Sequence, residues 1–473
     1  MSSIKVDVAV IGAGTAGLAA YRAAVAAGKR AVIIEGGSYG TTCARVGCMP
    51  SKLLIAAAEA AHVPSKWPDF GIRLEGNVRV DGRAVMARVR RERDRFVGLV
   101  LNGVDNIPGQ DKIQGYAKFA GDHTLIADDG TRVTFTSAVI ATGSAASIPP
   151  FLGGAGDLLI VNDDVFEWQD LPKSVAVFGP GVIGLEIGQA LHRLGVDVRM
   201  FGRDGHIGPF SDPHVRAYAN KTFQEEFFLD TNAVVRSIER VTDGVVIRHL
   251  DANGVEQSVL VDYVIAATGR APNVHNLGLE NTSVQLGRYG IPEFDRTTLQ
   301  CGASNIFIAG DVNNDLPLLH EAADEGKIAG DNAAHYPAVK SGLRRGPLAV
   351  VFSDPQLAII GARHAELAPG GFVTGAVSFE DQGRSRVMLR NKGLLHVYAD
   401  RSTGHLLGAE MIAPDAEHLA HLLAWAIQAK FTVAQALEMP FYHPVVEEGL
   451  RTALRDAQAK LNAAQLQQQY KAA

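Results

Sequence analysis

Two cysteines, Cys43 and Cys48, lie in the segment from Gly40 to Lys52, and they are the side chains best suited to redox chemistry. The chain has 473 residues and only three cysteines. A close pair can exchange electrons by forming and breaking a disulfide, it can bind a metal, or it can be two inert buried thiols. A metal site would need two more cysteine or histidine ligands nearby, and the segment contains none. Spacing alone leaves disulfide chemistry and inert thiols open.

The five-residue spacing also constrains the backbone that carries the pair. A regular helix would separate the two cysteines by about 7.5 Å along its axis, whereas a disulfide needs Cα atoms within about 7 Å. The segment therefore cannot be an undistorted helix if the pair bonds. We expect the irregularity at Gly47, or at Pro50 soon after it.

A dinucleotide-binding pattern ends just before this segment. A strand at residues 6–11 leads into a turn with Gly12, Gly14 and Gly17, and an alanine-rich helix then runs up to Gly28. A second strand at 31–34 is closed by the acid Glu35. The three turn glycines permit a tight turn, approach of the backbone to a pyrophosphate, and close packing of helix on strand. The helix N-terminus faces the phosphates, and Glu35 can accept hydrogen bonds from a ribose diol.

The same pattern returns at residues 175–186, with Gly179, Gly181 and Gly184 in its turn. Where the first copy ends in Glu35, the second has Gly202 followed by Arg203. An acid at this point binds the free ribose hydroxyls of NAD, whereas a cation accommodates the 2′-phosphate of NADP. The second site is therefore expected to bind NAD or NADP, with NADP slightly favoured.

Three further apolar runs end in glycine, at residues 139–143, 264–269 and 306–311. In open α/β sheets, ligands bind at the carboxyl ends of the strands. We therefore expect Asp311, which closes the third run, to bind hydroxyl groups of a cofactor.

The composition is that of a soluble globular protein, with 47% apolar and 20% charged residues. The net charge of −6 gives no reason to expect nucleic acid or an anionic membrane as a partner. The cysteines are too few for a secreted disulfide framework, and the first strand is not preceded by an export signal. We expect a cytoplasmic protein. The basic run at 88–95 is expected to be the solvated face of a helix at about 81–102, with Val85, Val89 and Phe96 inward.

These patterns predict an α/β protein with two Rossmann-like dinucleotide-binding domains and a C-terminal α+β domain. We expect the first nucleotide domain at 1–148, the second at 149–275, a return to the first at 276–340, and the α+β domain at 341–473. The last domain has a run of alternating strands followed by helices from Ala416.

The sequence resembles the FAD-dependent pyridine nucleotide–disulfide oxidoreductases of class I, and dihydrolipoamide dehydrogenase most closely. The resemblance covers essentially the whole chain and rests on six motifs, Gly12–Gly17, Cys43–Lys52, Gly179–Glu186, 267–270, Gly310-Asp311 and 443–448. It implies a redox disulfide, two cofactors and no resident metal. FAD would bind Gly12, Gly14, Gly17, Glu35, Gly40, Thr42, Lys52, Gly115, Thr142, Gly143, Gly310, Asp311 and Leu319. The nicotinamide nucleotide would bind Gly179, Gly181, Gly184, Glu186, Arg203 and Gly269.

The resemblance also implies roles for the catalytic side chains. Cys48 would be the charge-transfer thiol against the flavin, and Cys43 the interchange thiol that meets the substrate. Lys52 and Glu186 would form an ion pair near the flavin N5.

His443, oriented by Glu448, would be the acid–base group for the substrate thiol. In this family the partner subunit supplies that histidine, so the resemblance implies a homodimer. Because Pro444 suits the first position of a helix, we expect His443 at a helix start.

Several residues depart from the family pattern. Thr41 replaces the second glycine of the usual Gly-Gly-Thr-Cys, Arg45 replaces the common asparagine between the cysteines, and Val445 replaces a threonine. These departures leave lipoamide and NAD as expectations by analogy.

The expected function is that of a dihydrolipoamide dehydrogenase-like enzyme, which moves electrons between NAD(P)(H), FAD, the Cys43–Cys48 disulfide and a small dithiol or disulfide such as a lipoyl group. One alternative is an NADPH-dependent reductase of another small disulfide or of quinones. Another is a flavin-binding redox sensor. A mercury-reducing role is disfavoured because the C-terminus has no cysteine pair.

Overall fold

The computed structural model describes residues 3–472, with side chains described up to residue 467. The chain forms two compact units, each assembled from separate stretches of sequence. The first contains the residues up to Pro50, Val89–Ser147 and Gly269–Arg344, and the second contains Ser51–Arg88, Ile148–Thr268 and the residues from Arg345 on. The mixed α/β character that the sequence predicts is confirmed.

The first unit is built on a seven-stranded sheet in the order β3-β2-β1-β6-β5-β4, with β17 also paired to β6. Its strands are β1 (Ser3–Ile11), β2 (Ala31–Glu35), β3 (Lys112–Gln114), β4 (Ala117–Gly121), β5 (Thr124–Ala127), β6 (Arg132–Ile140) and β17 (Ile306–Ile308). Strands β1, β2, β3, β6 and β17 pair in parallel. The carboxyl ends of these parallel strands therefore meet at one edge of the sheet, which gathers the glycine-rich turns there.

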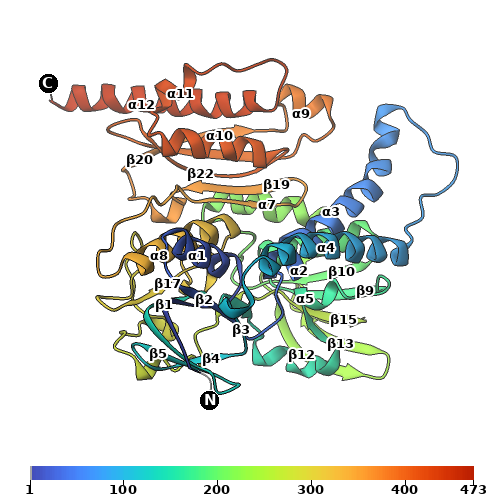
Figure 1. Cartoon of the computed structure of the whole chain (residues 1–473). Coiled ribbons are helices and arrows are strands. Elements are labelled where there is room, and N and C mark those ends of the chain that lie inside the picture. The colour runs from blue at the N-terminus through green and yellow to red at the C-terminus, as the bar shows by residue number, and fades with distance from the viewer. Residues whose placement is uncertain (1–2, 473) are drawn as a thin grey trace. The chain divides into compact units, whose positions relative to one another are not determined.

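Helices α1 (Thr15–Ala26) and α8 (Leu319–His335) pack against each other beside this sheet (Figure 1). Their contact is close because α8 carries two glycines where it crosses α1. A Cβ atom added to Gly326 would lie 2.2 Å from the Ala16 carbonyl oxygen, and one added to Gly330 would lie 2.3 Å from the Ala20 carbonyl oxygen. A short antiparallel pair, β7 (Ser144–Ala146) with β16 (Arg270–Pro272), completes the unit.

The second unit contains a parallel five-stranded sheet in the order β11-β10-β9-β15-β8. Its strands are β8 (Leu159–Val161), β9 (Ser174–Phe178), β10 (Asp197–Phe201), β11 (Phe228–Asp230) and β15 (Tyr263–Ala266). Helices α5 (Asn162–Val165), α6 (Val182–Arg193) and α7 (Pro213–Gln224) accompany it. An antiparallel sheet, β12 (Val234–Val241), β13 (Gly244–Leu250) and β14 (Glu256–Val261), is inserted before β15. Each of the two copies of the nucleotide-binding pattern therefore belongs to a sheet with parallel strands, one in each unit.

The C-terminal part of the second unit is an antiparallel sheet in the order β18-β19-β22-β21-β20, followed by helices (Figure 1). The strands are β18 (Leu348–Val351), β19 (Gln356–Gly361), β20 (Phe372–Ser378), β21 (Leu394–Asp400) and β22 (Leu406–Ala413). Helix α9 (Gly383–Val387) lies between β20 and β21, and the helices after the sheet are α10 (Ala416–Gln428), α11 (Val433–Leu437) and α12 (Glu447–Ala472). A hydrophobic core joins this sheet to α10 and α12. The predicted succession of strands and then helices is confirmed.

The basic run at 88–95 lies in α4 (Gly82–Asp105), which confirms the predicted helix. Val89 is fully buried, while Val85 and Phe96 are half-buried. No helix within residues 3–472 is both long enough and apolar enough to cross a membrane.

Candidate active site

A cavity of about 770 Å³ lies in the first unit at the carboxyl edge of its parallel strands. Seven of the residues predicted to bind a cofactor line it: Gly12, Gly14, Glu35, Thr42, Gly115, Thr142 and Gly143. The volume lies within the range of cofactor pockets, roughly 300–1,000 Å³. The first glycine motif is therefore part of a ready-made binding cavity.

The glycines of this motif fit a diphosphate group. A Cβ atom added to Gly17 would lie 1.8 Å from the Gly12 carbonyl oxygen, so only glycine allows this packing of helix on turn. Among the described residues, no heavy atom lies within 4 Å of a Cβ added to Gly14, which leaves its surroundings open to a ligand. Residues 15–18 carry no acid, so the N-terminus of α1 keeps its affinity for an anion.

Glu35 is fixed at the end of β2 by two backbone groups. One carboxylate oxygen accepts the Ala13 N–H at 2.6 Å, and the other accepts the Gly37 N–H at 2.7 Å. The carboxylate thus lies in the cavity at the position where the sequence places a ribose-binding acid.

Further cavity residues were not predicted, and they come from distant parts of the sequence. Tyr116 lies in the turn between β3 and β4, Lys118 lies in β4, and Asn273 and His275 follow β16. Asn273 donates its side-chain N–H to the Thr142 carbonyl at 2.9 Å, and its own carbonyl accepts the Thr142 hydroxyl at 2.7 Å. Local sequence carries no signal for these residues, because only the strand order brings them to the cavity.

Other predicted cofactor residues of the first unit do not line this cavity. They are Gly17, Gly40, Gly269, Gly310, Asp311 and Leu319. Asp311 accepts the Ser144 hydroxyl at 2.8 Å, and Arg270 donates to the same hydroxyl at 2.8 Å. The Gly310 N–H is held by the buried carboxylate of Glu325 at 2.7 Å.

The cysteine segment is a broken helix. Helix α2 (Thr42–Val46) contains Cys43, and helix α3 (Cys48–His62) begins at the second cysteine. Gly47, with φ −122° and ψ −117°, separates them, so the predicted irregularity at Gly47 is confirmed. Cys43 is partly exposed and Cys48 is exposed. Because its neighbours Thr42 and Arg45 line the cavity, the pair lies beside the candidate cofactor site.

Cys301, the third cysteine, lies in a different environment. Its side chain is 1% exposed within the hydrophobic core of the first unit. Burial raises the pKa of its thiol to about 12. It is therefore a core residue without thiolate chemistry at neutral pH.

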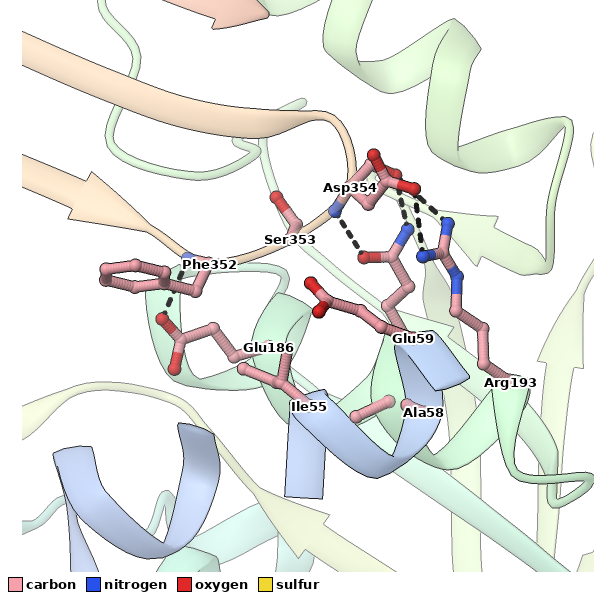
Figure 2. Close-up of a pocket in the computed structure, with 10 residues that line it drawn as sticks. Ile55, Ala58, Glu59, Glu186, Arg193, Phe352, Ser353 and Asp354 are labelled. Carbon is pink, nitrogen blue, oxygen red and sulfur yellow. Dashed lines mark hydrogen bonds and ion pairs between the residues drawn. The ribbon is translucent and has the colours of Figure 1, made fainter. Parts of the chain in front are cut away.

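In the second unit, Lys52 and Glu186 form the predicted ion pair. The Lys52 Nζ atom lies 2.7 Å and 2.8 Å from the two carboxylate oxygens of Glu186, whose side chain is only 5% exposed. The Phe352 N–H donates to the same carboxylate at 3.0 Å, and the Lys52 ammonium lies 4.6 Å from the centre of the Phe352 ring. Figure 2 shows Glu186 on α6 facing Phe352 beyond the end of β18.

The same contact between α6 and the loop after β18 is reinforced two turns further along the helix (Figure 2). Arg193 is almost fully buried and donates to Glu226 at 2.6 Å and to Asp354 at 3.1 Å. Although burial acts to raise it, the positive charge of Arg193 lowers the pKa of Asp354 below its usual value. These bonds fix the loop whose backbone holds Glu186.

The second glycine motif repeats the geometry of the first. A Cβ atom added to Gly184 would lie 1.9 Å from the Gly179 carbonyl oxygen, and a Cβ added to Gly181 would meet no described atom within 4 Å. At the expected acid position, a Cβ on Gly202 would lie 2.7 Å from Pro180 Cγ. Arg203 is 90% exposed and pairs with Asp204 at 3.0 Å.

Comparison with known proteins matches both halves of this architecture. The family described as pyridine nucleotide-disulphide oxidoreductase matches residues 6–326, and its dimerisation domain matches residues 348–454. The chain belongs to the pyridine nucleotide–disulphide oxidoreductase family. It is 30% identical to a dihydrolipoyl dehydrogenase from Geobacillus stearothermophilus, over 94% of this chain and 95% of that protein. It is also 30% identical to a mercuric reductase from Shigella flexneri, over 96% of this chain and 81% of that protein.

The fold is also found in solved structures. The HOCl-induced flavoprotein disulfide reductase RclA from Escherichia coli superposes with a TM-score of 0.80 at 21% identity, over 96% of this chain and 99% of that one. Pyridine nucleotide–disulphide oxidoreductases depend on FAD and a pyridine nucleotide and carry a redox-active disulfide. The open cradle at Gly14 and the anion-binding end of α1 fit the diphosphate of such a cofactor.

The dimerisation domain of this family member carries the histidine–glutamate pair. His443 Nδ1 lies 3.0 Å from a carboxylate oxygen of Glu448, and the His443 ring is 80% exposed. The hydrogen bond from His443 lowers the pKa of Glu448. The prediction that His443 begins a helix is wrong, because α12 starts at Glu447. The Glu448 carboxylate instead holds the loop ahead of the helix, and it accepts the Val445 N–H at 3.2 Å.

Proposed function

We propose that this chain is an FAD-dependent, dihydrolipoamide dehydrogenase-like oxidoreductase that couples NAD(P)(H) to a small dithiol or disulfide through Cys43 and Cys48. One observation carries the proposal: the cysteines lie on a helix break whose residues Thr42 and Arg45 line the dinucleotide cavity. In the reducing direction, NAD(P)H, one proton and a disulfide become NAD(P)⁺ and two thiols.

The bound flavin would supply two-electron transfer between the nicotinamide and the cysteine pair. Cys43 attacks the substrate disulfide as a thiolate, releases the first substrate thiol and forms a mixed disulfide. Cys48 then attacks the Cys43 sulfur, releases the second substrate thiol and leaves the Cys43–Cys48 disulfide. We assign FAD binding to residues 1–148 and 276–340, the nicotinamide nucleotide to 149–275, and dimer contacts to 341–473.

Within this proposal, Lys52 and Glu186 form a fixed pair of opposite charges at the site of hydride transfer. The nearly buried carboxylate is held by the Phe352 N–H as well as by Lys52, so its position is determined before any ligand binds. Such preorganised charge stabilises changes of charge without the cost of reorienting solvent.

His443 is proposed to move the proton of the substrate thiol. Glu448 binds Nδ1 and leaves Nε2 to face the substrate. The matched dimerisation domain and the high exposure of His443 support its insertion into the active site of a partner subunit.

The substrate is proposed to be a disulfide rather than a soft metal ion. The relatives include both dihydrolipoyl dehydrogenases and mercuric reductases. Apart from the redox pair, the sequence contains only Cys301, which lies buried in the core. A second accessible thiol pair that could receive a metal ion is therefore missing from the sequence.

The direct test is to assay the purified enzyme with lipoamide, dihydrolipoamide and oxidised glutathione, each with NAD(H) and NADP(H). The proposal expects lipoamide turnover, and no turnover with any of the three would refute the substrate assignment. Cys43→Ser should abolish disulfide turnover while flavin stays bound. Unchanged activity of that variant would refute the thiol mechanism.

A second candidate is an NADPH-dependent reductase of another small disulfide or of a quinone in the cytoplasm. Gly202 and Arg203 favour it, because the acid that binds an NAD ribose is missing and a highly exposed cation follows. Strong NADPH use with little lipoamide activity would distinguish it from the leading proposal.

A further inference from the structure

Arg45 differs from the family pattern, and the structure shows where its charge lies. It lines the dinucleotide cavity together with Thr41 and Thr42. Its guanidinium Nη1 donates to the Ser38 carbonyl at 3.2 Å, which is the one hydrogen bond of this side chain within the described residues. A guanidinium has five N–H donors, so most of its donor capacity is available to a ligand.

The stem of Arg45 is held against the backbone. A Cβ atom added to Gly40 would lie 3.0 Å from Arg45 Cδ and 3.2 Å from Arg45 Cγ. Gly40 has φ +120°, a conformation that favours glycine, so the chain keeps the space that the arginine stem fills. The stem therefore packs beside Gly40, and the arginine lies at the cavity wall.

Thr41 fixes the short helix that carries Arg45. Its hydroxyl accepts the Ala44 N–H at 3.4 Å, and its carbonyl accepts the Arg45 N–H at 3.1 Å. Thr41 has φ +59°, which is costly for a β-branched residue and is usually seen where a site demands it. Both departures from the family pattern thus act on the same wall of the cavity.

The other charges of the cavity favour an anion at this wall. The lining contains two permanent cations, Arg45 and Lys118, and one acid, Glu35. The Glu35 carboxylate already accepts two backbone N–H groups at 2.6 and 2.7 Å. A diphosphate at Gly14 and the N-terminus of α1 would lie in the same cavity as the Arg45 guanidinium.

We propose that Arg45 binds a phosphate group of the dinucleotide cofactor, with Thr41 as the residue that positions it. This inference rests on the proposed FAD site. It gives the cofactor diphosphate a side-chain cation in addition to the backbone cradle of the glycine motif. A bidentate arginine–phosphate contact is stronger and more directional than one made by lysine.

The experiment measures FAD release from the purified holoenzyme by the rise of flavin fluorescence after dilution, at low and high salt. The variants are Arg45→Met, which keeps the length of the stem, and Arg45→Lys, which keeps the charge. Arg91→Met is the matched control, because Arg91 lies on α4, is 67% exposed and pairs with Glu92. Thermal unfolding of each flavin-free protein shows whether a variant has lost its fold.

Arg45→Met should weaken FAD retention by about tenfold to a hundredfold at low salt, the factor expected for one charged hydrogen-bonding contact. Arg45→Lys should recover part of the loss, and Arg91→Met should match the wild type. High salt should reduce the difference in FAD release between Arg45→Met and the wild type, because salt screens the charge of Arg45. Unchanged FAD release in Arg45→Met, with flavin-loaded wild type, would overturn the inference alone. Wild-type protein that binds no FAD would overturn the proposed function as well.

Discussion

Replacing Gly14 by alanine should separate cofactor binding from folding. Gly14 has φ −73° and ψ −172°, an extended conformation that alanine adopts without strain. Among the described residues, no heavy atom would lie within 4 Å of the new methyl group. Loss of unfolded-state entropy stabilises Gly14→Ala by about 0.4–1 kcal/mol. Alanine is a poorer N-cap by about 1 kcal/mol, so the two effects nearly cancel.

The affinity for FAD, unlike the stability of the fold, should fall in Gly14→Ala. The methyl group enters the cavity where we propose that the backbone binds the diphosphate, and the loss of one charged hydrogen bond costs about 1.5–3 kcal/mol. The Kd for FAD should therefore rise about tenfold to a hundredfold. We would measure the flavin-to-protein absorbance ratio and the Kd for FAD, with thermal unfolding of the flavin-free protein as the test of folding.

The second motif provides a matched control. Gly181 has φ −82° and ψ −167°, and a Cβ added to it also meets no described atom within 4 Å. Gly181→Ala should retain FAD and weaken binding of the nicotinamide nucleotide by a similar factor. Gly17→Ala should instead impair folding, because its Cβ would lie 1.8 Å from a carbonyl oxygen. Wild-type FAD affinity in Gly14→Ala, or loss of FAD in Gly181→Ala, would refute this reasoning.

Three further predictions concern groups outside the glycine motifs. At pH 8, thiol reagents should modify two cysteines of the reduced native protein, and Cys301 only after denaturation. The reason is that Cys301 is buried and, with a pKa of about 12, only about one in ten thousand of its thiols is ionised. Lys52→Met should lower the free energy of unfolding by about 1–3 kcal/mol, which is less than for a fully buried pair because Lys52 is 32% exposed. In a double-mutant cycle measured by denaturant unfolding, Lys52→Met/Glu186→Gln should recover part of that loss, and strictly additive effects would contradict this coupling. Although burial acts to raise it, the hydrogen bond from His396 lowers the pKa of Asp212 below its ordinary value of 3.8. The Asp212 carboxylate therefore stabilises the fold above pH 3.8, and this stabilisation is lost as the pH falls below that value. Asp212→Asn should flatten the acid side of a plot of stability against pH, and an unchanged slope would refute the role of Asp212.

The sequence predicts features that depend on local backbone geometry. The turn glycines and the break at Gly47 follow from steric rules that act over a few residues, the acid at the end of β2 follows from the nucleotide-binding motif, and the structure has all three. The Lys52–Glu186 pair joins residues 134 positions apart, and only the family resemblance predicts it.

Features that depend on strand order or on loop conformation could not be predicted in this way. Tyr116 enters the cavity because β3 pairs with β2, and the local sequence of the turn does not encode that pairing. The helix start expected at His443 failed for a different reason. A proline signals a helix start only through its own backbone preference, whereas the Glu448 carboxylate holds the preceding loop by hydrogen bonds.

The contact between Pro180 and Gly202 has a consequence for how this enzyme can evolve. The Pro180 ring occupies the space that a side chain at position 202 would need, and Thr231 Cα would lie 3.0 Å from the added Cβ on another side. An acid at position 202 therefore requires that Pro180 change or shift and that the backbone at Thr231 give way slightly. The effect of a substitution at position 202 thus depends on the residue at position 180.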